Sequence, residues 1–167
     1  MFDAVWPTLP AAFRTELILQ CVKHLKSAPG EYDAFARAIA DAIKARPQSV
    51  KAQWRMSDAF GTLRALALNP KAGAPFFATT YMGVRKTELA ALYDALGVAH
   101  TDLEVAESSA VEAPPTAAQF AAVLANGLAG VPDDSVRCMV AIIADAGIDA
   151  WQAPAREALG QHTQPKA

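Results

Sequence analysis

Histidine and cysteine often bind metals or act as nucleophiles in proteins, and this chain has three histidines and two cysteines. The histidines lie in separate segments, without the short spacing that a zinc site needs: they are His24, His100 and His162. Cys21 and Cys138 each fall within an apolar helical pattern, so we interpret them as reduced core residues rather than as nucleophiles or a disulfide. We therefore predict no catalytic residue, no metal site and no cofactor.

Paired carboxylates can serve as an acid and a base, and two pairs occur in the C-terminal half. Asp133 and Asp134 follow a proline at the predicted start of a helix, where acidic side chains cap the helix and interact with its dipole. Asp145 and Asp149 are four residues apart, as expected for neighbours on the solvated face of that helix. No motif of the Gly-Lys-Ser/Thr, His-Glu-x-x-His or Cys-x-x-Cys type occurs. An enzyme or cofactor binder would thus need a site assembled from dispersed residues.

Charge is divided unevenly along the chain. Residues 1–86 contain 12 Lys or Arg against 6 Asp or Glu, a net charge of +6, whereas residues 87–167 contain 3 against 11, a net charge of −8. Cations that neutralise phosphates can bind nucleic acid. The predicted basic surface consists of Arg37, Lys44, Arg46, Lys51, Arg55 and Arg64. The alternative is a solubilising surface, or one attracted to the chain's own acidic half, and the isoelectric point near 5.9 favours this alternative.

Helices must position these residues, because apolar residues recur at helical spacing along most of the chain. The first helix should begin within 8–12, with Thr8 as its cap, and should end before Pro29. Further helices are predicted near 35–46, 49–68, 84–96, 117–130 and 134–150, with a short one near 154–160. The predicted fold class is all-α, a helical bundle or short α-solenoid of about six helices within a single domain, 1–167.

An internal repeat is one interpretation of the helix pattern. The segment 35–50 resembles the segment 120–136, with Phe35 aligned on Phe120 and Pro47 on Pro132. Two three-helix repeats would then occupy 8–70 and 84–160. The alternative is that both halves share a helix-turn-helix pattern without common ancestry.

Two connecting segments separate the predicted helices. Residues 69–83 are predicted to form a loop, in which the aromatic stretch 76–82 is a connector or a single helical turn. Residues 101–116 are predicted to form an exposed acidic linker. Thr101 and Thr116 each precede Glu or Gln by three residues, which predicts a capping box at each end of that linker.

The fifth predicted helix has an unusual outer face. Where the second helix carries charged residues, the fifth has small and nearly uncharged ones, and small residues let another backbone approach closely. The predicted partner-binding surface consists of Ala122, Asn126, Ala129 and Gly130. The alternative is that the segment 151–160 folds back and covers this face.

The predicted function is a non-enzymatic helical protein-protein interaction module: an adaptor, a chaperone-like protein or a regulatory subunit. Its partner would be another protein or a second copy of the chain. The first alternative is a nucleic-acid-associated accessory protein that uses the basic half, and the second is an enzyme or cofactor binder. No stretch has the roughly 20 apolar residues of a membrane span, and residues 1–7 do not resemble a secretory signal, so a cytoplasmic location is expected.

Overall fold

The structure is a computed structural model that describes residues 1–27, 30, 33–34, 36–37, 40–41, 44–50 and 73–162. The all-α prediction is confirmed, because the regular structure of these residues is helical apart from one two-stranded hairpin. The helices are α1 (Phe2–Val5), the 3-10 turn η1 (Trp6–Thr8), α2 (Ala11–Ser27), α6 (Gly73–Gly83), α7 (Lys86–Ala95), the π-helical turn η2 (Ser108–Glu112), α8 (Ala117–Asn126), α9 (Asp133–Ala146) and α10 (Asp149–His162). Among them, none is both long and apolar enough to cross a membrane.

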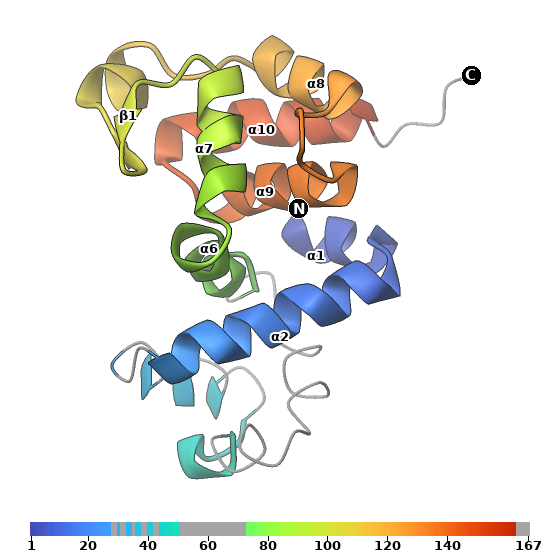
Figure 1. Cartoon of the computed structure of the whole chain (residues 1–167), viewed down its shortest axis with the longest axis vertical. Helices are drawn as coiled ribbons and strands as arrows, with labels where there is room; N and C mark the ends of the chain where they lie inside the picture. Colours follow the sequence, from blue (N-terminus) through green and yellow to red (C-terminus); the bar gives the residue numbers. More distant parts are fainter. Residues whose placement is uncertain are drawn as a thin grey trace.

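Helix α9 is the centre of the described fold. It contacts α10, α6, α1, α8 and α7, and in Figure 1 it lies between α10 and α1 while α7 runs steeply across both α9 and α10. Its residues from Cys138 to Ala144 are all buried. The stretch from Cys138 to Ala144 has no polar residue, and such a stretch is stable in a helix only when other elements surround it. The position of α9 therefore follows from its sequence.

Helix α6 replaces the loop predicted over 69–83, and that prediction is wrong for residues 73–83. Phe76, Phe77 and Tyr81 are all buried, because α6 contacts α2 on one side and α9 on the other. Pro75 lies in the first turn, where proline is tolerated because the backbone N–H groups there have no intrahelical partner. Apolar residues lie on several faces of the segment, so its sequence shows no single stripe from which a helix could be predicted.

The N-terminal segment also forms helix that the sequence did not predict. Phe2, Val5 and Trp6 are buried, and the ring of Phe77 stacks on Trp6 with 4.6 Å between centroids. Thr8 does not cap α2, since its hydroxyl donates to the carbonyl of Val5 at 2.7 Å. This segment, which precedes α2, thus packs its aromatic side chains against α6 and α9.

Three helix boundaries differ from the prediction. Helix α8 ends at Asn126 rather than near 130, because Gly127 adopts a φ of +69° that terminates the helix. Gly147 separates α9 from α10, so Asp145 and Asp149 lie on different helices and the predicted carboxylate pair is wrong. Helix α10 is longer than the short helix predicted near 154–160.

The segment 101–116 is more ordered than a linker. Strands β1 (His100–Thr101) and β2 (Glu104–Val105) form an antiparallel hairpin whose turn residues, Asp102 and Leu103, have positive φ. The capping box predicted at Thr101 is therefore wrong. The one at Thr116 is confirmed, because its side chain accepts from the Gln119 backbone while Gln119 accepts from the Thr116 backbone.

Several predictions lie outside the described residues. These include Phe35 and residues 51–68 of the third predicted helix, which contain the basic residues Lys51, Arg55 and Arg64. The superposition of two three-helix repeats depends on these positions. The repeat therefore stays a prediction.

Candidate functional site

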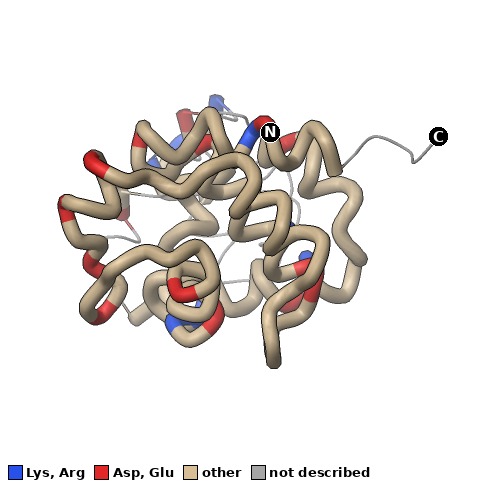
Figure 2. The backbone as a smooth tube through the Cα atoms, turned by 90° about the horizontal axis from the view of Figure 1, so that it is seen from above, with Lys and Arg blue, Asp and Glu red and all other residues tan. Residues whose placement is uncertain are grey.

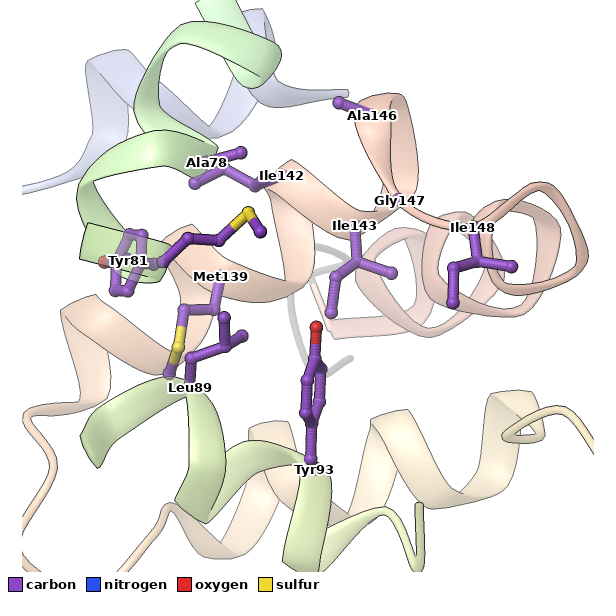
Figure 3. A pocket seen from close by; sticks show the side chains of 11 residues that line it. Ala78, Tyr81, Leu89, Tyr93, Met139, Ile142, Ile143, Ala146, Gly147 and Ile148 are labelled. Carbon is purple, nitrogen blue, oxygen red and sulfur yellow. The ribbon is translucent and has the colours of Figure 1, made fainter. Parts of the chain in front are cut away.

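A mostly apolar cavity of about 180 Å³ lies between α6, α7, α9 and the turn that leads to α10 (Figure 3). Its buried walls come from Tyr81, Leu89, Met139, Ile142 and Ile143. The other lining residues are more exposed: Ala78, Met82, Tyr93, Ala146, Gly147 and Ile148. We call this space the α6–α9 cavity.

The rim of the α6–α9 cavity includes an exposed methionine. Met82 lines the cavity and is 56% exposed. Large apolar side chains that stay in solvent next to an apolar hollow are a feature of binding surfaces. Methionine adapts its shape to different ligands because it is unbranched and polarisable.

Tyr93 supplies a hydroxyl to this cavity. Figure 3 shows its side chain rising from α7 with the oxygen directed toward Ile143. Its ring makes edge contacts with Trp151, at 5.8 Å between centroids, and with His100, at 5.4 Å. His100 is in turn held by Asp94 at 3.3 Å. Burial raises the pKa of Tyr93, so the hydroxyl is neutral at physiological pH.

A polar cluster lies beside the cavity and consists of the buried residues Tyr81, Arg85 and Ser135, the partly buried Gln20 and Glu88, and the exposed Glu16. Arg85 is at its centre and is only 7% exposed. Its guanidinium donates to Gln20 at 2.6 Å and to Glu16 at 2.7 Å, and it reaches Glu88 at 3.3 Å. Arg85 thus ties α2 to α7 across the α6–α7 turn.

The hydroxyl of Ser135 completes this cluster from α9. It donates to Glu88 and lies 2.9 Å from the hydroxyl of Tyr81. Since the hydrogen of Ser135 is used by Glu88, Tyr81 is the donor in its own bond to Ser135. Arg85 also donates to the Ser135 oxygen at 3.4 Å. Ser135 is fully buried, so this arrangement acts as a structural tie between helices rather than as an accessible nucleophile.

The cysteines match their prediction. Cys21 and Cys138 are both free and buried, and burial raises the pKa of each thiol to about 12. A thiol that stays protonated at neutral pH is a poor nucleophile. Within the described residues, no group of three or more His, Cys, Asp or Glu side chains is placed to hold a metal ion.

The predicted partner-binding residues are all exposed, but they do not form one helical face. Ala122 and Asn126 lie on α8, whereas Ala129 and Gly130 belong to the turn after it. Helix α10 packs against α8, whose buried residues are Phe120, Val123 and Leu124. The C-terminal helix therefore covers α8 without covering the four predicted residues.

The described members of the basic surface, Arg37, Lys44 and Arg46, are also exposed. Figure 2 shows acidic residues spread around the outside of the described chain rather than gathered in one place. Asp145 departs from the predicted solvated pattern. Its carboxylate is only 10% exposed and accepts from the Met1 amino group at 2.9 Å and from the Phe2 backbone at 2.8 Å.

Sequence reasoning identified neither the α6–α9 cavity nor the polar cluster. Tyr93 follows the same helical spacing as its apolar neighbours Leu89 and Leu92, and Arg85 carries no local signal that distinguishes it from a surface cation. No protein-family model matches this chain, and neither do the curated proteins or the solved structures compared with it. The functional argument therefore depends on the geometry of the described residues.

Proposed function

We propose that this protein is a non-enzymatic, cytosolic helical module that binds a protein partner, as an adaptor or regulatory subunit does. The observation that supports the proposal is the α6–α9 cavity, an apolar hollow with the exposed Met82 on its rim. Interfaces owe most of their binding energy to a few large side chains that fill such pockets. The walls of the cavity offer apolar contact and one hydroxyl, which suits the anchoring of one partner side chain.

A cavity-filling variant tests this proposal. Ala78 lines the cavity from α6 and is half-buried, so Ala78→Leu should occupy part of the space without removing an existing contact. The matched control is Ala118→Leu, at an exposed position of α8 outside the cavity. The parent chain and the control should capture the same proteins from lysate of the native cell. Ala78→Leu should not capture them. Equal capture by all three proteins would contradict the proposal.

A second copy of the chain is the other protein partner to consider. The exposed end of α8 and the turn after it, with Ala129, would form that contact. Ala129→Arg adds a long cation at an exposed turn position, so the variant should stay folded. If this surface is an interface, light scattering should show that the variant loses a dimer that the parent forms. An unchanged assembly state would contradict the dimer.

Nucleic-acid binding is a second candidate function, and the exposure of Arg37, Lys44 and Arg46 favours it. Binding through these cations would be electrostatic, and raised salt would weaken it because exposed charges are screened within about 10 Å at 0.1 M ionic strength. Gel-shift titration with mixed DNA and RNA at low salt is the test. No shift at tens of micromolar protein would contradict this function.

A further inference from the structure

We infer that the α6–α9 cavity takes the side chain of a tyrosine of the protein partner, whose hydroxyl bonds to that of Tyr93. The inference rests on the proposed function and identifies the chemistry of the anchor. It follows from the size of the cavity, the composition of its walls and the unused hydrogen-bonding group in it.

The size of the cavity suits one aromatic ring. An apolar cavity of about 150 Å³ in another protein binds benzene. The α6–α9 cavity, at about 180 Å³, is larger by roughly 30 Å³. A single aromatic ring therefore fits in the cavity.

The walls favour an aromatic ring over an aliphatic chain. Met82 and Met139 place thioether sulfurs at the cavity, and sulfur makes favourable contacts with the edges of aromatic rings. The ring of Tyr93 adds an aromatic surface. None of the described residues that line the cavity is charged, so a buried Lys, Arg, Asp or Glu anchor would lack a counter-ion there.

The hydroxyl of Tyr93 decides between tyrosine and phenylalanine. Within the described part of the chain it has no hydrogen-bond partner, whereas the hydroxyl of Tyr81, on the other side of the cavity, bonds to Ser135. Covering the cavity with a purely apolar ring would desolvate the Tyr93 hydroxyl without replacing its bonds to solvent. A phenolic anchor supplies both a donor and an acceptor at that point.

Two ring contacts hold the side chain of Tyr93 in this orientation. Its ring is held between Trp151 and His100, and the indole N–H of Trp151 donates to the Ser109 carbonyl at 3.3 Å. A group held in its binding orientation loses little conformational entropy when the ligand arrives. The Tyr93 hydroxyl is therefore suited to discriminate between ligands that do and do not hydrogen-bond.

The first experiment uses p-cresol and toluene, which are the side-chain analogues of tyrosine and phenylalanine. Both are titrated into the full chain and into Tyr93→Phe, and binding is followed by NMR shifts of the cavity methyl groups. We expect p-cresol to bind the parent protein, and the ratio of p-cresol to toluene affinity to fall about fivefold in Tyr93→Phe. That change corresponds to one net hydrogen bond. Comparing the ratio in two proteins cancels the difference in hydrophobicity between the two probes.

Control variants show whether the two probes bind in the α6–α9 cavity. Ala78→Leu should weaken both probes, and Ala118→Leu should weaken neither. Tyr93→Phe keeps the ring and its contacts, so it remains informative even if Ala78→Leu does not fold. An unchanged affinity ratio in Tyr93→Phe would overturn the inference, and so would p-cresol shifts that lie outside the cavity.

A second experiment separates this inference from the proposed function. The partner captured by the parent protein is challenged with saturating p-cresol, and we expect release of the partner. If p-cresol binds the cavity but no partner is captured or released, both the tyrosine anchor and the proposed function are wrong. If the partner needs an open cavity but p-cresol does not bind there, the proposed function stands and the tyrosine anchor is overturned.

Discussion

Tyr81 and Tyr93 both line the α6–α9 cavity, yet their hydroxyls have opposite surroundings (Figure 3). The hydroxyl of Tyr81 points out of the cavity into the polar cluster, where it bonds to Ser135. The hydroxyl of Tyr93 lies at the cavity, where no described side chain bonds to it. The same two helices build both regions, since α7 carries Glu88 and Leu89 while α9 carries Ser135 and Met139.

The comparison shows that one helix interface contains both a hydrogen-bonded polar cluster and an apolar space. In the polar cluster, each buried donor has an acceptor, so the cluster fixes the distance between α2, α7 and α9. One turn further along, the same helices leave an apolar space with a hydroxyl that a ligand can use. A movement of α7 toward that space would strain the bonds that Arg85 makes to Gln20 and Glu16 of α2. Three variants and one change of pH test whether the polar cluster stabilises the fold and the Tyr93 hydroxyl does not.

The largest effect is expected for Arg85→Ala. Removing the guanidinium leaves Glu88 partly buried, at 20% exposed, and deprives Gln20 of its partner, so unfolding should become easier by about 3 kcal/mol. Urea denaturation followed by tryptophan fluorescence measures the change. Arg156→Ala is the matched control, because its side chain is 48% exposed and lies 3.8 Å from Asp145, and it should cost less than about 0.5 kcal/mol. Equal losses in the two variants would show that the cluster is not a structural tie.

Alkaline pH should destabilise the fold, because two thiols in the core have raised pKa values. The thiols of Cys21 and Cys138 have a pKa of about 12 in the folded chain, against an ordinary value of 9.0. Between pH 9 and 12 the unfolded chain therefore binds fewer protons than the folded one, and stability falls as pH rises. In this range, each thiol lowers the free energy of unfolding by at most about 1.4 kcal/mol per pH unit.

Burial also raises the pKa of Tyr81 well above its ordinary value, so the region of the polar cluster is the more alkali-sensitive one. Urea denaturation at pH 8, 9 and 10, with a reducing agent present, measures the slope of stability against pH. Cys138→Ala should make that slope shallower. If the slope is identical in the parent and in Cys138→Ala, the raised pKa of the Cys138 thiol does not contribute to the pH dependence of stability.

Tyr81→Phe should have a moderate effect. The variant keeps the ring that lines the cavity and removes the bond to Ser135, at a cost of about 1 kcal/mol. Chemical denaturation measures this loss, and p-cresol binding should be preserved because the cavity wall is unchanged. A variant as stable as the parent would mean that the Tyr81 bond contributes nothing to the cluster.

Tyr93→Phe should have the smallest effect on stability. The hydroxyl has no partner among the described residues, so its removal should change the free energy of unfolding by less than about 0.5 kcal/mol. The same denaturation experiment compares it with Tyr81→Phe. A loss as large as that of Tyr81→Phe would show that the two hydroxyls are equivalent, and the comparison would fail.

Features that depend on local residue patterns can be predicted from the sequence alone. The apolar stripes of α2 and α9 and the capping box at Thr116 follow from residue spacing, because a helix places residues three and four apart on one face. The state of Cys21 and Cys138 was predicted for the same reason. Exposed positions such as Ala122 could be assigned to a surface, but not to one continuous face, since the end of α8 depends on the conformation of Gly127.

Contacts between residues that are distant in the sequence depend on the tertiary fold. Helix α6 is helical because α2 and α9 bury it from two sides, and its own sequence shows no periodic stripe. The partners of Arg85 come from α2, α7 and α9, and the neighbours of Tyr93 come from β1 and α10. No local propensity encodes such contacts, because they depend on the angles and offsets at which separate helices pack.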